Sequence, residues 1–383
     1  MTSFLKSAAL VALCALASCT KPLETASYSV VPLPSEVTPS EGTPFRLNSR
    51  TSVFYPTGNA LLKRNAEFLS EYVAQSMNFA LPVREQAEGE ALEHAITLVL
   101  DSTINNEEGY RLSVTEKSIR IEGRTEQGIF YGIQTLRKSL PAVAESKSIL
   151  LPAAVVNDEP RFTYRAMHLD VCRHFFPVEF VKKYIDLLAL HNMNTFHWHL
   201  TDDQGWRIES KKYPKLNEIG SVRHRTVVGY LGSGEYDNTD YGGYYTQEQM
   251  KEVVAYAAER YINVLPEIDL PGHTLSVLAS YPEFGCTGGP YEVCPDWGVF
   301  PDVLCIGNEQ AMQFVEDILG ELIEIFPSRY IHIGGDEAPR VRWKNCPKCQ
   351  KRIAEEGLRA GGGFTAEDRL QSYCMQRAES VLD

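Results

Sequence analysis

Four short apolar stretches in residues 159–383 each end in acidic or histidine side chains, and this repetition constrains the fold more than any other feature. The stretches are "YRAMHLDV", "MNTFHWHLTDD", "INVLPEIDLPGH" and "YIHIGGDE". Segments with helical apolar spacing separate them. Strands that alternate with helices form parallel sheets, so the pattern predicts an α/β fold, with a (β/α)8 barrel of the TIM type as the leading candidate.

The polar residues of these stretches gather at the C-terminal end of each predicted strand. They are Asp170, Asp202 with Asp203, Asp269 with His273, and Asp336 with Glu337. In a TIM-type barrel the active site lies at this end of the strands. The sequence therefore predicts one carboxylate-rich site built from four strand ends.

The number of strands falls short of a whole barrel. A complete barrel takes about 250 residues and eight strands, whereas residues 159–383 offer only four. We expect about the first four strands, the N-terminal half of a catalytic barrel, and a chain that is cut inside the barrel. A parallel sheet of this kind would leave one edge unpaired.

A different pattern precedes residue 159. Helical spacing in "NALLKRNAEFLSEYVAQS" and "TEQGIFYGIQTLRKSL" predicts two helices, and "AITLVLD" predicts a short buried strand. "GYRLSVTEKSIRIEG" alternates with period two around a polar turn, which is typical of a hairpin. Strands and helices mix without regular alternation, so residues 28–158 are expected to form a small α+β domain.

The N-terminal segment has the composition of an export signal. Residues 1–18 contain one Lys and an apolar run too short to cross a bilayer, and they lead into "LASC". This ending resembles a bacterial lipoprotein signal, with Cys19 as the lipidated residue and 19–27 as a tether. We expect an exported chain, lipid-anchored to a bacterial membrane on the periplasmic or cell-surface side. The alternative is a plain signal with an incidental Cys.

Charge and composition exclude some partners. The net charge is −13 and no basic run occurs, which argues against nucleic acid because phosphates require clustered Lys and Arg. Hydrophobic residues make up 44% and charged residues 23%, as in ordinary globular proteins. Membrane contact is expected only through the lipid anchor.

The nine cysteines permit disulfides if the chain is exported. Cys286 and Cys305 bracket a long loop and are the predicted bridge. "CPKC", Cys346–Cys349, could be half a zinc site or a redox pair. No second CxxC stands at zinc-finger spacing and no neighbouring His completes a ligand set, which favours a local structural pair or free thiols. No metal site is expected.

Four ordered motifs carry a family resemblance. "LDVCRHFFP", "HWHLTDDQGWR", "PEIDLPGH" and "HIGGDE" resemble the β-N-acetylhexosaminidases of glycoside hydrolase family 20, of the bacterial lipoprotein type. The resemblance runs from about residue 28 to the end of the chain. It implies retaining, substrate-assisted hydrolysis of terminal, non-reducing β-linked GlcNAc or GalNAc. The implied partner is a carbohydrate, and no cofactor is implied.

The resemblance also assigns roles to individual residues. Glu337 matches the acid/base that protonates the glycosidic oxygen, and Asp336 matches the group that orients the sugar's acetamide. Asp202 and His273 match a supporting pair that positions the acid/base. Arg173 matches the Arg that holds ring hydroxyls, for which a planar guanidinium is well suited.

Two alternatives remain open. The family's acetamide pocket draws tryptophans, a Tyr and an acid from strands after "GGDE", which this chain lacks, so an inactive fragment or a sugar-binding remnant is possible. "HWH" could instead belong to a metal-dependent barrel hydrolase, with His197 and His199 on one face of a strand. Further ligands at matched positions of later strands are not visible for that second alternative.

Overall fold

The computed structural model describes residues 23–87 and 92–383. The chain divides into two compact units, Met1–Arg161 and Phe162–Asp383. The predicted signal, residues 1–18, and Cys19 lie outside the described residues. Within the described ranges, no helix is long and apolar enough to cross a membrane.

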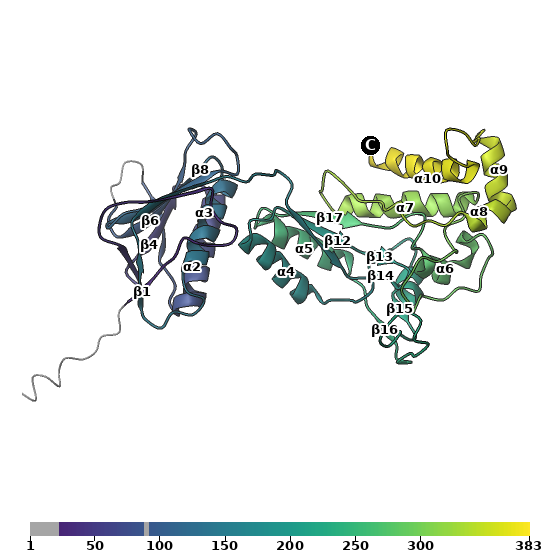
Figure 1. Ribbon diagram of the computed structural model, residues 1–383, viewed down its shortest axis with the longest axis horizontal. Helices are drawn as coiled ribbons and strands as arrows, with labels where there is room; N and C mark the ends of the chain where they lie inside the picture. Colours follow the sequence, from purple (N-terminus) through teal and green to yellow (C-terminus); the bar gives the residue numbers. More distant parts are fainter. Residues whose placement is uncertain (1–22, 88–91) are drawn as a thin grey trace, which may run out of the picture. The chain divides into compact units, whose positions relative to one another are not determined.

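The first unit is a mixed seven-stranded sheet with two helices packed against it (Figure 1). The helices are α2 (Ala60–Met77) and α3 (Glu126–Ser139), which contact each other. In sheet order the strands are β2 (Glu36–Pro39), β10 (Ala154–Asp158), β7 (Tyr110–Val114), β8 (Ser118–Gly123), β6 (Ala95–Leu100), β4 (Ser52–Pro56) and β5 (Val83–Gln86).

Local sequence signals explain these elements. Asn59 and Thr125 cap the two helices, each by accepting a hydrogen bond from a backbone N–H of the first turn. β7 and β8 pair antiparallel, so the predicted hairpin is confirmed. β6 pairs parallel with both β8 and β4, which makes the sheet mixed.

A second, three-stranded sheet corrects one sequence prediction. It contains β1 (Glu24–Thr25), β9 (Ser148–Leu151) and β3 (Phe45–Asn48). β1 pairs with Ile149 and Leu150, and Ala26 is buried. The tether predicted over residues 19–27 is therefore wrong for its last residues, because backbone pairing and burial hold them in the fold.

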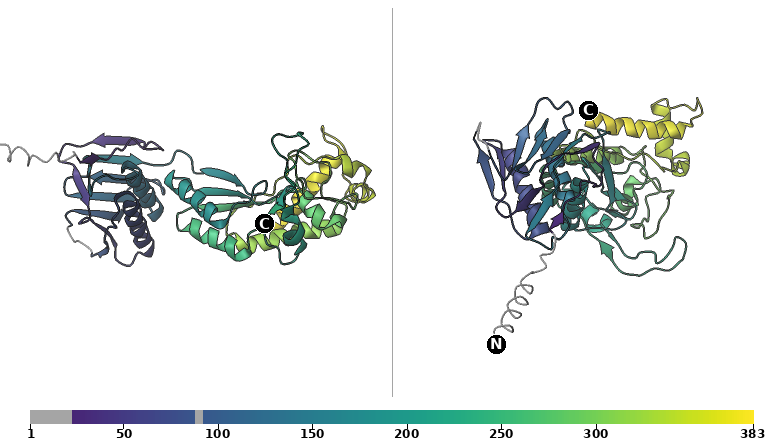
Figure 2. Two further views of the ribbon diagram at one scale, coloured as in Figure 1. Left: turned by 90° about the horizontal axis from the view of Figure 1, so that it is seen from below. Right: turned by 60° about the vertical axis from the view of Figure 1, so that its left-hand side comes forward.

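The second unit is built on three parallel strands with helices along one side of the sheet (Figures 1 and 2). The strands are β11 (Ala166–Asp170), β12 (Thr195–His199) and β17 (Asn263–Glu267), and the helices α4 (Val178–Leu190), α5 (Gln247–Ala258) and α7 (Glu309–Ile325). Side chains alternate along a strand, so in β12 Phe196 and Trp198 share one face while His197 and His199 share the other. The apolar pair is fully buried.

The predicted fourth strand, "YIHIGGDE", does not form as a regular strand. A single parallel bridge joins His332 to Glu267, with hydrogen bonds from His332 N to Pro266 O and from Ile268 N to His332 O, both 3.0 Å. Gly334 and Gly335 then adopt positive φ of 67° and 113°, which takes the chain out of the extended conformation. The described residues contain no closed barrel.

Shorter elements connect and follow these strands. They are β13 (Thr201–Asp202), β14 (Gly205–Trp206), the π-helical turn η1 (Leu216–Gly220), β15 (Val222–Arg223), β16 (Tyr241–Gly242), α6 (Leu275–Ser280), the 3-10 turn η2 (Pro282–Phe284), α8 (Val341–Asn345), α9 (Pro347–Glu355) and α10 (Ala366–Leu382). α10 packs along α7 (Figure 1), where Arg377 Nη1 lies 2.8 Å from Glu309 Oε1.

The disulfide predicted between Cys286 and Cys305 is not formed, because both residues are free thiols. They belong to a group of four with Cys346 and Cys349, in which all sulfur atoms lie within 4.8 Å of one another. We call this group the four-cysteine cluster. Three of its Sγ···Sγ distances are 3.6–3.8 Å, far longer than a disulfide bond of about 2.05 Å.

Arg207 joins the loops around the strand ends. Its side chain is fully buried and donates four hydrogen bonds to backbone carbonyls. The acceptors are Val171 O at 3.0 Å, Cys172 O at 2.6 Å, Ser221 O at 2.7 Å and Gly243 O at 2.9 Å. This guanidinium therefore fixes the segment that immediately precedes Arg173.

Arg207→Met is expected to lower the free energy of unfolding by at least about 3 kcal/mol, because each buried carbonyl left without a donor costs about 1–3 kcal/mol. Chemical denaturation monitored by circular dichroism measures the change. Arg329→Met, at an exposed position of the same unit, is the matched control and should stay within about 0.5 kcal/mol of the parent. Equal stability of the two variants would contradict the anchoring role.

Candidate active site

The predicted site residues gather in one cavity at the C-terminal ends of the parallel strands. The cavity measures about 440 Å³, within the roughly 300–1,000 Å³ range of small-molecule sites. It is lined by His168, Arg173, His197, His199, Asp202, Glu267, Asp269, His273, His332, Gly334, Asp336 and Glu337. All five predicted catalytic, supporting and substrate-binding residues are among them.

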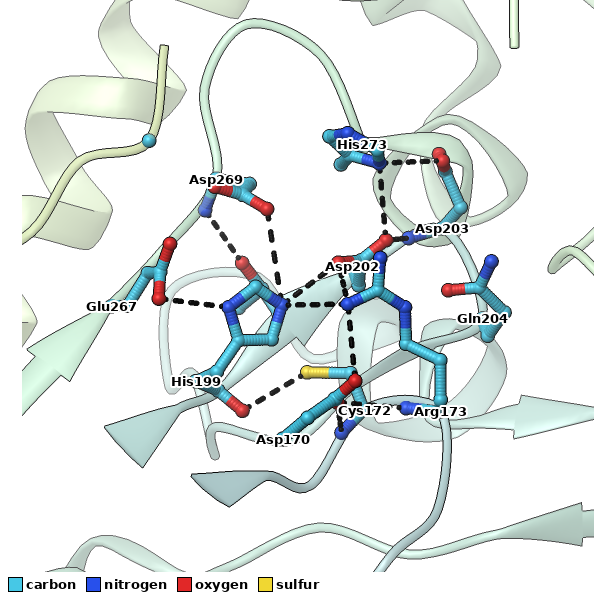
Figure 3. A network of polar contacts seen from close by, with 12 residues as sticks. Asp170, Cys172, Arg173, His199, Asp202, Asp203, Gln204, Glu267, Asp269 and His273 are labelled. Atoms are coloured by element: carbon cyan, nitrogen blue, oxygen red, sulfur yellow. Dashed lines mark hydrogen bonds and ion pairs between the residues drawn. The ribbon is translucent and has the colours of Figure 1, made fainter. Parts of the chain in front are cut away.

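His273 links Glu337 to two buried carboxylates. Its Nδ1 lies 3.1 Å from Asp203 Oδ2 and 3.3 Å from Asp202 Oδ1, and its Nε2 lies 3.2 Å from Glu337 Oε2. Figure 3 shows the contacts of His273 with the two aspartates. Hydrogen bonds to Asp202 and Asp203 raise the pKa of His273 to about 11, so both ring nitrogens carry protons and donate.

Asp203 is a site residue for which the sequence assigned no role. It lies closer to His273 than Asp202 does, and its Oδ1 accepts a hydrogen bond from Leu275 N at 2.9 Å. Its position directly after Asp202 in "LTDD" was the available signal. The predicted pair of Asp202 and His273 is thus a group of three with Asp203.

The backbone is strained where His273 and Glu337 meet. His273 has φ of 52° and Glu337 has φ of 42°, a region that non-glycine residues rarely adopt. Such conformations cost about 1–3 kcal/mol each and cluster at functional sites. Gly334 is required nearby, because a Cβ there would lie 2.3 Å from Asp269 Oδ1. The surrounding packing therefore holds the acid/base candidate in a defined direction.

Arg173 neutralises the carboxylates from the other side of the site (Figure 3). Its Nη1 lies 2.7 Å from Asp202 Oδ2 and 3.1 Å from Asp170 Oδ2. Its Nε is a buried donor that has no hydrogen-bond partner in the described part of the chain. Asp170 and Asp202 thus hold Arg173 through Nη1.

Asp336 and Glu337 face the same cavity and are both exposed. Glu337 keeps 55% of its side-chain surface accessible although it contacts His273. A carboxylate that is both accessible and oriented by a buried group can exchange a proton with a bound molecule. Asp336, one residue earlier, lies next to that position.

Glu267 is a second residue that sequence reasoning missed. Three histidines surround it: His197 Nε2 at 2.5 Å, His199 Nδ1 at 2.9 Å and His332 Nδ1 at 3.0 Å. The contact between His199 Nδ1 and Glu267 is an ion pair, because the two groups are not aligned for a hydrogen bond. Burial by itself would raise the pKa of Glu267, but the contacts with His197 and His199 lower it below its usual value. The three histidines therefore share one carboxylate as a structural partner.

The arrangement favours carboxylate chemistry over the metal-dependent alternative. Several His and carboxylate groups here lie close enough to share an ion. However, Arg173 Nη1 lies 3.3 Å from His199 Nε2 and 2.7 Å from Asp202, and His273 is protonated between Asp203 and Glu337. Protein cations thus already occupy the positions where a metal would bind His199, Asp202 or Asp203.

Two family models match the chain and show the family to which it belongs. The model described as glycosyl hydrolase family 20, catalytic domain, matches residues 162–383, and the model for domain 2 of that family matches residues 27–159. The chain belongs to glycosyl hydrolase family 20. Membership confirms the coarser fold prediction, an N-terminal domain followed by a catalytic domain of TIM-barrel type.

Individual family 20 proteins agree over most of the chain. A beta-hexosaminidase of Porphyromonas gingivalis is 41% identical over 361 residues, which cover 92% of this chain and 44% of that protein. A beta-N-acetylhexosaminidase structure from Bacteroides fragilis matches with a TM-score of 0.73 and 32% identity, covering 92% of this chain and 64% of that one.

A third relative has a bound sugar. The exo beta-N-acetylglucosaminidase of Vibrio harveyi, in complex with N-acetylglucosamine, matches with a TM-score of 0.77 and 31% identity. The match covers 94% of this chain and 54% of that one. The chain spans less than half the length of the curated Porphyromonas relative and of its Vibrio furnissii counterpart, at 44% and 46%.

Asp269 should give this family 20 site a measurable pH dependence. Burial, followed by the charges of Asp202 and Glu267, raises the pKa of Asp269 from 3.8 to about 7. Between these values the native state holds a proton that the unfolded state has lost, so this group makes stability fall as pH rises. Asp269→Asn removes that slope, and the variant should gain stability relative to the parent from about pH 4 to about pH 7.

Urea denaturation of parent and variant at a series of pH values measures this difference. Glu235→Gln, which removes an exposed carboxylate from the same unit, is the matched control and should show a constant difference from the parent. A constant difference for Asp269→Asn as well would contradict the raised pKa.

Proposed function

We propose that the protein is a β-N-acetylhexosaminidase that removes terminal, non-reducing β-linked GlcNAc or GalNAc from glycans by retaining, substrate-assisted hydrolysis. The contact between His273 Nε2 and Glu337 Oε2, backed by Asp202 and Asp203, is the observation that carries this proposal. It orients one accessible carboxyl group at a cavity lined also by Asp336 and Arg173. The names of relatives, including a structure that contains N-acetylglucosamine, support the substrate class.

Glu337 acts as the general acid and then as the general base. In the first step it donates a proton to the glycosidic oxygen as the bond from that oxygen to the anomeric carbon breaks. In the second step it accepts a proton from the attacking water. His273 donates a hydrogen bond from Nε2–H to Oε2 of this carboxyl group and so holds the same oxygen in place through both steps.

Asp336 serves the substrate's own nucleophile. The carbonyl oxygen of the 2-acetamido group attacks the anomeric carbon, and the acetamide nitrogen gains positive charge in the resulting oxazolinium ion. A carboxylate that accepts the N–H stabilises this charge. Two inversions at one carbon give net retention, and no protein nucleophile is needed. Adjacent carboxylates therefore suit this reaction, because only one of them handles protons.

Arg173 binds the sugar. Its side chain lines the cavity and keeps 23% of its surface exposed, while Asp170 and Asp202 hold Nη1 of the guanidinium in place. A rigid donor of this kind suits a ring hydroxyl. The oriented acid/base also favours an enzyme over a sugar-binding remnant, since binding alone would not require strained backbone at Glu337.

Substrate comparison tests this mechanism. Because the acetamide is the nucleophile, a chromogenic β-N-acetylglucosaminide should be hydrolysed by the protein at least about 100-fold faster than the matching β-glucoside. Asp336→Asn should lower kcat on the N-acetylglucosaminide by about 100- to 1,000-fold. Continuous release of the chromophore measures both.

The control is Asp240→Asn, which changes an exposed carboxylate of the same unit and should retain the parent's kcat. Circular dichroism spectra should show that all variants are folded. Comparable rates on the glucoside and the N-acetylglucosaminide would exclude substrate assistance, and unchanged turnover by Asp336→Asn would exclude the role given to that residue.

We also propose that the protein is exported and anchored through a lipid on Cys19. The "LASC" sequence that follows a short apolar run supports this proposal. Cells that express the protein should incorporate labelled palmitate into it and retain it in the membrane fraction. Cys19→Ala should abolish both, whereas Cys14→Ala should change neither. Labelling of the Cys19→Ala variant would contradict the assignment.

A further inference from the structure

The four-cysteine cluster draws its ligands from three separate segments of the second unit. Cys286 follows η2, Cys305 lies in the loop before α7, and Cys346 and Cys349 flank the start of α9. Cys305 Sγ lies 3.6 Å from Cys346 Sγ and 3.7 Å from Cys349 Sγ, and Cys286 Sγ lies 3.8 Å from Cys349 Sγ. Chain segments far apart in sequence thus direct four thiols at one point.

These distances match a tetrahedral metal site. A zinc ion with four sulfur ligands at about 2.3 Å places the sulfur atoms about 3.8 Å apart. Disulfides require about 2.05 Å, and the cluster contains no such contact. Three of the four residues are buried and Cys286 is half-buried, so the cluster is largely shielded from water.

The backbone around the cluster is shaped to bring the ligands together. Gly307, two residues after Cys305, packs against the start of α9, where a Cβ would lie 2.1 Å from the carbonyl carbon of Lys348. Cys346 immediately precedes Pro347, the first residue of α9, and Cys349 lies in its first turn. This is the close backbone approach that a metal-binding pair of cysteines needs.

We propose that the four-cysteine cluster binds one Zn²⁺ ion as a structural site. Binding displaces four thiol protons to solvent, and no oxidation or reduction takes place. Four protein ligands leave no open position, so the ion has no catalytic role. The cluster thus departs from the sequence expectations of no metal site and of a disulfide.

The proposed zinc site would stabilise the two segments that carry His273 and Glu337. Leu304, beside Cys305, donates its N–H to Pro271 O at 3.0 Å and accepts a 2.9 Å hydrogen bond from Trp343 Nε1. Gly272 packs against Ala338, as a Cβ added to Gly272 would lie 3.2 Å from Ala338 Cα. The chain next to His273 is therefore joined to the chain after Glu337 close to the metal ligands.

Metal analysis tests the proposal independently of activity. The protein, purified under reducing conditions and dialysed against metal-free buffer, should contain one zinc per chain by inductively coupled plasma mass spectrometry. Cys305→Ser and Cys349→Ser should each lose at least about 90% of it, since a missing thiolate opens the site. Cys374→Ser, at a buried cysteine of α10 outside the cluster, should retain the full amount.

A second measurement keeps the test decisive if the serine variants do not fold. Titration of the parent with an organic mercurial should release its zinc to a chromogenic chelator as the cluster thiols are modified, and should lower the melting temperature. Three outcomes would overturn the proposal: a parent without zinc, peptide mapping that shows disulfides among these cysteines in protein purified without added reductant, or iron in place of zinc.

Discussion

Two adjacent buried carboxylates, Asp202 and Asp203, are the constraint on which the site depends. Their burial and mutual repulsion are unfavourable unless cations and donors surround them. Burial would raise the pKa of Asp202, but hydrogen bonds from His199 and His273 and the charge of Arg173 lower it to about 2. Arg173 and His273, which have roles in the proposed reaction, are thus also groups that make this burial possible. Loss of one of these cations would leave a buried charge unpaired and would affect the fold together with the chemistry.

The parallel sheet supports this arrangement by separating two kinds of side chain. β12 turns Phe196 and Trp198 toward one face and His197 and His199 toward the other, where Glu267 from the neighbouring strand meets both histidines. Polar groups can gather on that face because each has a partner. The loops then bring Arg173 and His273 to the strand ends, and Arg207 fixes the first of these loops through backbone carbonyls.

Local and short-range features were predictable from the sequence. The hairpin over residues 110–123 followed from period-two alternation. The helices that begin at Gln247 and Ala366 each open with a capping box in the structure, a signal that lies within four residues of sequence. The four strand-end motifs identified the residues that line the cavity. These signals are readable because the interacting groups lie within a few residues of one another or recur at each strand end.

Features that depend on distant segments were not predictable in the same way. Two glycines at positive φ turn the fourth predicted strand away after one bridge. The pairing of Glu24 with Ile149 could not be read from composition at the N-terminus. The partners of Cys286 and Cys305 lie at the start of α9, where Cys346 and Cys349 follow Cys305 by 41 and 44 residues and Cys349 follows Cys286 by 63. Asp203 and Glu267 acquire their importance only through His273 and three histidines on other segments.

The left-handed backbone at Glu337 has a consequence for how such a site changes over time. Asn and Gly tolerate this conformation better than Glu does, so replacement of Glu337 by either relieves strain while it removes the proposed acid/base. Activity and thermal resistance are therefore opposed at this position. Under the proposed role, a protein that no longer required catalysis could exchange Glu337 for Asn or Gly with a gain in stability.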